Sequence, residues 1–198
     1  MSSIDTKISS YTTYFSNYGN RGSNLVLASQ RLNGSVVMPN EEFSYTNVVG
    51  PYTYGIGYKV ATAYIDGEIS SAIGGGVCQL ASTLYNAELR AGLTTTARKN
   101  HIFAQDYVPK GLDATIYSDT VDLKFKNELQ YPIYISSYVI GGSLNVDIWS
   151  NSKAIEGKKF EPYAVYSNGG YHAYLNVYEN DVLIETRYLN SSYYKAHY

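Results

Sequence analysis

The chain has 198 residues, a length that fits one domain of ordinary size and can bury a core without disulfides or metals. Its formal net charge is −2 and only 16% of its residues are charged, which argues against a basic surface for nucleic acid or acidic lipid. The 23 tyrosines favour strands and half-buried surfaces that bind carbohydrate or peptide.

The first 20 residues are polar and rich in serine and threonine, which is typical of a linker. No apolar run in the chain approaches the ~20 residues that a membrane span needs, and no signal-peptide core is present. We therefore expect a soluble chain with a linker over 1–20, and we expect the export signal or membrane anchor of the protein to be absent from it.

Two helices are predicted. Over 22–34, apolar residues recur at helical spacing between a candidate N-cap, Ser23, and a stop at Gly34. The second helix starts behind three glycines and stops at Gly92, and only Glu88 interrupts its apolar face. The residues that define the two faces are Leu25, Ala28 and Leu32 in the first helix, and Val77, Leu80, Ala81, Leu84 and Ala91 in the second.

The rest of the chain reads as short strands and turns. Pro39 and Asn40 separate two extended pieces, and Asp66-Gly67 is the strongest short hairpin signal. Strand-like runs follow the second helix: "TTTARKNHIFAQDYV", "DATIYS", "VDLKFKN", "YPIYISSYVI" and "SLNVDIW". Because strands are grouped and do not alternate with helices, we predict an α+β fold with the second helix packed on a largely antiparallel sheet.

The last part of the chain, 151–198, contains two further candidate hairpins, at Asn168-Gly169 and Asn180-Asp181. Forty-eight such residues are too few to hold a core of their own. We therefore expect a β-hairpin extension that packs on a main domain over 21–150.

The only cysteine, Cys78, lies in "GGGVCQ", in the first turn of the second helix. The helix dipole and unpaired amides there favour a thiolate and can bind an oxyanion, with Gly75 and Gly76 as candidate donors. Gly74 to Gly76 have no obvious packing role. The structural alternative is that Cys78 is a small buried apolar residue.

A cysteine nucleophile needs a base, and the chain has three histidines. His101 is preferred, because it follows the helix on a segment that can return to the helix start. His172 is the second choice, and His197 lies one residue from the terminus. Asp113 is the preferred group to orient the imidazole and Asp106 is the alternative, although either aspartate can instead cap a turn.

Other kinds of site are not expected. One cysteine and three scattered histidines offer no pair with the spacing of a zinc site. The glycines at 55–57 and 74–76 lack the residues that complete a nucleotide-binding motif. We therefore expect neither a metal nor another cofactor.

Four stretches together identify the region 21–150 as a member of the VanW domain family, which is common in Gram-positive bacteria. They read "VVMPNEEFSYTNVVGP", "GYKVATAYIDGEISSAIGGGVCQLASTLYNAELRAGL", "RKNHIFAQDYVPKGLDATIY" and "DLKFKNELQYPIYI". The resemblance implies an extracytoplasmic protein of the cell wall or outer membrane face, commonly tethered by an N-terminal membrane segment. It also implies, for some members, L,D-transpeptidase activity that forms 3-3 cross-links between peptidoglycan stem peptides through a cysteine acyl-enzyme.

By this resemblance Cys78 matches the family cysteine, His101 matches the family histidine, and Asp113 lies in the family's Asp-Ala-Thr motif. The neighbours of His101 depart from the usual pattern, with Asn at 100 and Ile at 102. The implied mechanism places Gln79 and Tyr85 at the edge of the site, although a helical tyrosine is more often part of a core.

Two alternatives stay open. If water resolves the thioester, the same site is a cysteine carboxypeptidase or endopeptidase of peptidoglycan. If Cys78 is buried and inert, the chain is a non-catalytic cell-wall-binding module that uses its tyrosines. The diamino acid of the acceptor, the oligomeric state and the role of 151–198 do not follow from the sequence.

Overall fold

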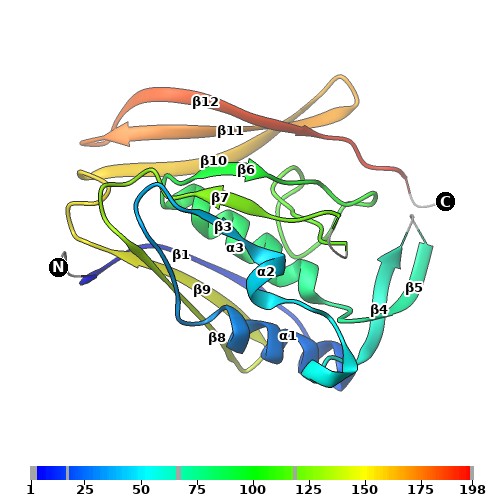
Figure 1. The fold of residues 1–198 in the computed structure, drawn as a ribbon. Helices are drawn as coiled ribbons and strands as arrows, with labels where there is room; N and C mark the ends of the chain where they lie inside the picture. Colours follow the sequence, from blue (N-terminus) through cyan, green and yellow to red (C-terminus); the bar gives the residue numbers. More distant parts are fainter. Residues whose placement is uncertain (1–3, 17, 66–67, 118–119, 197–198) are drawn as a thin grey trace.

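The computed structural model describes residues 4–16, 18–65, 68–117 and 120–196, and its ribbon is shown in Figure 1. Helices and antiparallel sheets are mixed, so the prediction of an α+β fold is confirmed. The strands form several sheets rather than one. No helix in this described part is both long and apolar enough to cross a membrane.

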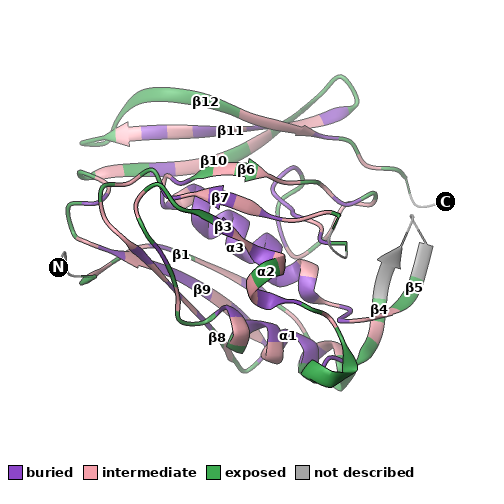
Figure 2. Ribbon diagram, in the orientation of Figure 1, coloured by how far each residue is buried: buried purple, intermediate pink, exposed green. Residues whose placement is uncertain are grey.

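The long helix α3 (Val77–Arg90) is the centre of the molecule. Nearly all of its residues are buried, as the purple ribbon in Figure 2 shows. On one side it packs against a four-stranded sheet, and on the other against the C-terminal sheet (Figure 1). The four-stranded sheet has the order β1 (Thr6–Tyr14), β9 (Ser143–Ser150), β8 (Ile133–Ile140), β2 (Ser35–Val37), and α1 (Gly19–Leu32) packs against β8.

Two smaller sheets complete the fold. One has the order β3 (Glu42–Ser44), β7 (Lys124–Lys126), β6 (Thr94–Ala97), and the other pairs β4 (Val60–Ile65) with β5 (Glu68–Ile73). The predicted Asp66-Gly67 turn lies outside the described residues, but the strands on either side of it are paired as a hairpin requires. A short helix α2 (Tyr45–Val49) and a 3-10 turn η1 (Tyr54–Ile56) complete this region.

The C-terminal sheet consists of β10 (Lys158–Ser167), β11 (Gly170–Glu179) and β12 (Val182–Ser192), in that order. Its two turns fall at the predicted positions, where Asn168 and Asn180 have φ angles of 48° and 50°. The sheet shares the core of the rest of the chain through Phe160. Gly92 allows this contact, because a Cβ there would lie 2.5 Å from the ring of Phe160.

The linker predicted over 1–20 is wrong where the structure describes it, because 6–14 form strand β1. The serines and threonines that suggested a linker make specific hydrogen bonds inside the fold. Ser9 Oγ donates to the carbonyl of Ala87 at 2.8 Å, and the Thr13 and Thr83 hydroxyls are 2.8 Å apart. A polar strand is thus held against the buried helix by hydroxyl hydrogen bonds.

Two other expectations are corrected. Ser23 is not the N-cap of α1, which begins at Gly19; the Ser23 hydroxyl donates to the carbonyl of Gly19 within the first turn. Of the runs expected as strands after α3, those from residue 121 onward form β7, β8 and β9, whereas the first run forms a strand only over 94–97 and the chain from 98 to 116 is an irregular loop. Part of the backbone of this loop is hydrogen-bonded by the side chains of Ser82 and Asn86 in α3, which a strand-like sequence pattern does not indicate.

Candidate active site

The glycines before α3 are required for packing, contrary to the expectation from the sequence. A Cβ at Gly75 would lie 2.5 Å from the carbonyl oxygen of Ala61, so the backbone of β4 comes too close for any side chain. Gly76 has a φ of 111°, which L side chains rarely adopt. The turn therefore sets the helix start, and with it Cys78, directly beside the β4–β5 hairpin.

The sulfur of Cys78 is partly buried and contacts the chain at Thr115 and Ile116. The amide of Ile116 donates to Sγ at 3.3 Å, and the hydroxyl of Thr115 lies 3.8 Å away. The carbonyl oxygen of Ile116 is 3.5 Å from Sγ and can accept from a protonated thiol. A donor amide aimed at sulfur favours the thiolate.

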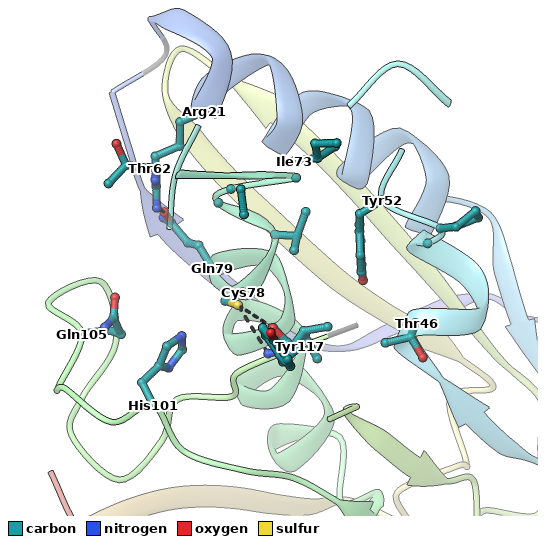
Figure 3. A pocket seen from close by; sticks show the side chains of 18 of the residues that line it. Arg21, Thr46, Tyr52, Thr62, Ile73, Cys78, Gln79, His101, Gln105 and Tyr117 are labelled. Carbon is teal, nitrogen blue, oxygen red and sulfur yellow. Dashed lines mark hydrogen bonds between the residues drawn. The ribbon is translucent and has the colours of Figure 1, made fainter. Parts of the chain in front are cut away.

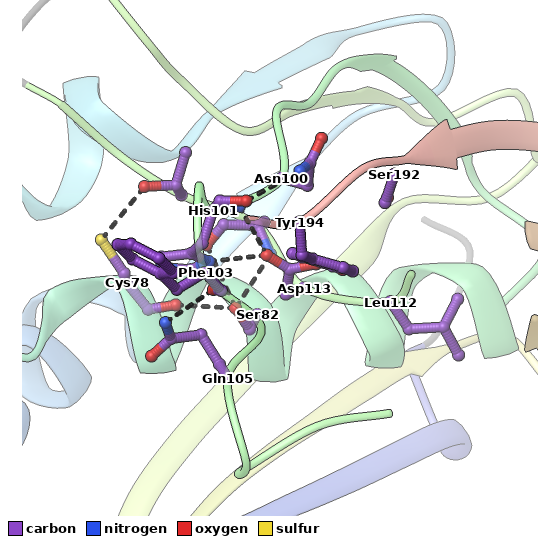
Figure 4. A network of polar contacts seen from close by, with 12 residues as sticks. Cys78, Ser82, Asn100, His101, Phe103, Gln105, Leu112, Asp113, Ser192 and Tyr194 are labelled. Atoms are coloured by element: carbon purple, nitrogen blue, oxygen red, sulfur yellow. Dashed lines mark hydrogen bonds and ion pairs between the residues drawn. The ribbon is translucent and has the colours of Figure 1, made fainter. Parts of the chain in front are cut away.

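A polar stripe on α3 holds the loop that provides these contacts. Cys78, Ser82 and Asn86 are spaced by four and so lie on one face of the helix. The Ser82 hydroxyl accepts from the amide of Ala114 at 2.9 Å, and the Asn86 amide donates to the carbonyl of Leu112 at 2.7 Å. Figure 4 shows the loop lying along the helix. This spacing was present in the sequence and could have predicted a polar seam.

The imidazole of His101 is held by Asp113 at the same helix end (Figure 4). Its Nδ1 is 2.6 Å from Oδ2 of Asp113, and the backbone amide of His101 donates to the same oxygen at 2.7 Å. Both side chains are almost fully buried. Because a carboxylate only accepts hydrogen bonds, Nδ1 carries the proton, and Nε2 lies 3.5 Å from the hydroxyl of Tyr107 in the cavity that contains Cys78.

The second oxygen of Asp113 is held by residues that the sequence did not suggest. Arg98 Nη2 donates to Oδ1 at 3.0 Å, and the hydroxyl of Tyr194 donates to the same atom. Arg98 is in turn held by Asn190 and Ser192 of β12, each at 2.9 Å. The C-terminal extension therefore completes the surroundings of Asp113.

The three groups shift each other's pKa values toward charged forms. Burial alone would raise the pKa of Cys78, but the interaction with His101 and the amide of Ile116 lower it below its usual value. Burial alone would lower the pKa of His101, but Asp113 and Cys78 raise it to about 9. Burial alone would raise the pKa of Asp113, but His101 and Arg98 lower it. The arrangement therefore supports a thiolate beside an imidazolium.

The other candidates named from the sequence lie elsewhere or act differently. His172 is on β11, where it contacts the Ser191 hydroxyl at 2.6 Å, and it does not line the cavity of Cys78. His197 lies outside the described residues. Asp106 lines the cavity from an exposed position, whereas Tyr85 is buried in the core away from it.

The helix start offers fewer free amides than expected. The amides of Gly75 and Gln79 donate to the carbonyls of Ala72 and Gly76, so neither is available to an oxyanion. Among the described residues, the amides of Gly76 and Cys78 donate to no backbone carbonyl. They are the donors that can face a substrate oxygen. The side chain of Gln79 is buried and contacts Arg21.

A cavity of about 860 Å³ opens above Cys78 (Figure 3). Cys78 and His101 line it together with side chains from α1, α2, the β4–β5 hairpin and the loop after β6. Such a volume suits a peptide-sized ligand. The described residues contain no group of three or more histidine, cysteine, aspartate or glutamate side chains placed to hold a metal ion.

Comparison with known proteins gives a consistent family. The model of the family described as VanW like protein matches residues 20–149. An uncharacterized protein, YoaR of Bacillus subtilis, is 40% identical over 146 residues, which are 73% of this chain and 48% of that protein. The vancomycin B-type resistance protein VanW of Enterococcus faecalis is 32% identical over 124 residues, 59% of this chain and 45% of that protein. The chain thus spans about half the length of these relatives, and no solved structure matches it.

Proposed function

Because the chain belongs to the VanW-like family, we propose that it is a cysteine acyltransferase of the cell wall, an L,D-transpeptidase that forms 3-3 cross-links between peptidoglycan stem peptides. The observation that carries the proposal is the presence of Cys78 and His101 in the lining of one peptide-sized cavity, with the imidazole of His101 held by Asp113. The name of the Enterococcus faecalis relative, a vancomycin resistance protein, fits a substrate in the cell wall. The protein would then act outside the cytoplasmic membrane.

In the acylation step the thiolate of Cys78 attacks the carbonyl carbon of the third residue of a tetrapeptide stem. The new C–S bond forms as the C–N bond to the terminal D-Ala breaks. The imidazolium of His101 gives its Nε2 proton to the departing amine, and the amides of Gly76 and Cys78 stabilise the oxyanion. Asp113 holds the imidazole in the orientation that points Nε2 at the cavity.

In the transfer step the side-chain amine of a neighbouring stem attacks the thioester. His101, now neutral, takes a proton from this amine as the new C–N bond forms. The C–S bond breaks and the thiolate of Cys78 returns, with the imidazolium beside it. The paired charges of the resting site are thereby restored, which is the state that the shifted pKa values favour.

The proposal is tested by incubating the chain with disaccharide-tetrapeptides and analysing the products by mass spectrometry. We expect a dimer formed with loss of D-Ala, and no dimer with the Cys78→Ala variant. A shortened monomer without dimer would identify a hydrolase instead. No product, together with Cys78 alkylation as slow as that of an ordinary buried thiol, would leave a wall-binding module as the function.

A further inference from the structure

The cavity of Cys78 contains a second charged side chain, Arg21, which the proposed mechanism does not use (Figure 3). Arg21 lies in the first turn of α1. Its aliphatic stem crosses the glycine before α3, since a Cβ at Gly76 would lie 3.0 Å from Arg21 Cγ. The guanidinium is thus brought to the start of the helix that presents the nucleophile.

The guanidinium is fixed by a buried amide. Arg21 Nη2 donates to Oε1 of Gln79 at 2.7 Å. Gln79 cannot turn away, because its Nε2 donates to Thr13 Oγ1 at 3.1 Å and to the carbonyl of Tyr14 at 2.9 Å. The amide oxygen is therefore directed at Arg21 by residues of strand β1.

This anchor positions Arg21 without neutralising it. Gln79 is uncharged, and none of the ion pairs found among the described residues includes Arg21. Arg98, the other arginine near the site, is by contrast paired with Asp113. The carboxylate that shares the cavity, Asp106, is on an exposed loop position. A positioned guanidinium without a carboxylate partner is suited to an anionic ligand.

We propose that Arg21, backed by Gln79, binds the C-terminal carboxylate of the donor peptide. The inference rests on the proposed function for the nature of the peptide, and on the geometry for the carboxylate. In the leaving residue, the carboxylate carbon is two bonds from the nitrogen that departs. A carboxylate bound at Arg21 therefore sets the scissile carbonyl close to the helix start and to Cys78.

The first test uses alkylation of Cys78 in the full chain and needs no natural substrate. Iodoacetate and iodoacetamide differ mainly in the carboxylate, so the ratio of their rates reports an anion site beside the thiolate. We expect Arg21→Gln to lower the iodoacetate-to-iodoacetamide ratio about tenfold, with Arg21→Lys in between. Lys59→Gln is the matched control, because Lys59 is exposed, lies outside the cavity and carries the same charge.

An unchanged ratio in Arg21→Gln, or an equal fall in Lys59→Gln, would overturn the anion site. This outcome is independent of the reaction that the chain catalyses. If the ratio falls as expected while the wild type leaves tetrapeptides unchanged, the anion site stands and the proposed transpeptidation fails.

The second test identifies which carboxylate is bound. Donor stems are compared with a free C-terminal carboxylate, with a C-terminal amide, and with an amide on the side chain of the diamino acid. For the two stems that keep a free C-terminal carboxylate, we expect Arg21→Gln to raise KM about tenfold with little change in kcat. The stem with a C-terminal amide should be a poor substrate of the wild type, and the variant should not change its kinetics. Sensitivity to the amide on the diamino acid instead would overturn the assignment to the C-terminus.

Discussion

Asp113 accepts hydrogen bonds at both oxygens. These hydrogen bonds determine up to which pH the thiolate of Cys78 and the imidazolium of His101 exist together. The His101 amide and Nδ1 share one oxygen, while Arg98 and Tyr194 share the other. Four donors compensate the burial of the carboxylate, so it stays ionised and keeps the imidazole protonated. The thiolate–imidazolium pair is therefore populated between the lowered pKa of Cys78 and the pKa of His101 at about 9.

The variant Asp113→Asn tests this interpretation. Without the carboxylate the pKa of His101 falls and, with less imidazolium nearby, the pKa of Cys78 rises, so the pH window of the pair narrows from both sides. We expect kcat/KM to fall about 10² to 10⁴-fold and the alkaline limb of its pH profile to move below pH 9. The pH dependence of the rate of Cys78 alkylation reports the pKa of Cys78, which sets the acidic limb. The matched control is Asp106→Asn, and a control profile that shifted equally would refute the assignment of Asp113.

Tyr52 has a hydroxyl that is buried at the cavity and has no hydrogen-bond partner among the described residues (Figure 3). Its ring packs edge-on against Tyr58 at 5.4 Å, so the hydroxyl cannot easily move to another acceptor. Burial raises its pKa, so the hydroxyl remains a donor at all working pH values. The oxygen is closed to solvent in the free protein, so it binds a carbonyl of the substrate only where the cavity wall opens around the ligand.

The variant Tyr52→Phe separates this role from a structural one. Since the unsatisfied hydroxyl costs stability, we expect the free energy of unfolding to stay equal or to rise by about 1 kcal/mol. We expect kcat/KM for the peptide to fall about tenfold, because a hydrogen bond to the substrate is lost. Denaturant titration and steady-state kinetics measure the two effects. Unchanged kinetics would show that the hydroxyl does not contact the substrate.

At the scale of elements, α3 contains a buried carboxyl that the mechanism does not use. Glu88 is 0% exposed; its Oε1 accepts from the Thr95 hydroxyl at 2.7 Å, and its Oε2 has no partner among the described residues. Burial raises the pKa of Glu88 well above its usual value, so the folded helix contains the neutral acid. The neutral Glu88 carboxyl contributes fully to stability at pH values below its pKa in the unfolded chain. This contribution is lost as pH rises through its pKa in the folded chain.

The pH dependence of unfolding tests the state of Glu88. We expect wild-type stability, relative to Glu88→Gln, to fall by up to about 1.4 kcal/mol per pH unit between roughly pH 5 and 7. Denaturant titrations at several pH values measure the difference in slope. Glu179→Gln, at an exposed position of β11, is the control and should follow the wild type. Parallel curves for Glu88→Gln and wild type would contradict a neutral Glu88.

At the scale of the whole molecule, the parts predicted from the sequence are those with local signals. Three such signals each lie within a short stretch of sequence: the periodicity of α3, the glycines before Cys78 and the two asparagine turns of the C-terminal sheet. The loop from 98 to 116 was not predictable in this way, because its partners are side chains of α3 and β12. Tyr194 gave no signal either, since it lies 81 residues from Asp113 in sequence.

The position of Tyr194 joins the C-terminal extension to the chemistry. Its hydroxyl accepts from the amide of Gly111 at 2.7 Å and donates to Asp113, and the next residue donates its amide to the carbonyl of Ile102. The end of the chain thus supports the loop of His101 on both sides. The family model ends at residue 149, so this support comes from outside the matched region.

The variant Tyr194→Phe tests whether the extension tunes the site. The variant removes one hydrogen bond that stabilises the negative charge of the Asp113 carboxylate. The carboxylate therefore attracts the His101 imidazolium more strongly. We expect the alkaline limb of the kcat/KM profile to move to higher pH by less than about one unit, opposite in sign to Asp113→Asn, with a loss in rate of about tenfold. Tyr193→Phe is the matched control, because that neighbouring ring is 60% exposed and contacts His172 instead. A limb that moves to lower pH, or an equal shift in the control, would mean that the hydroxyl supports only the fold of the loop and not the charge of the site.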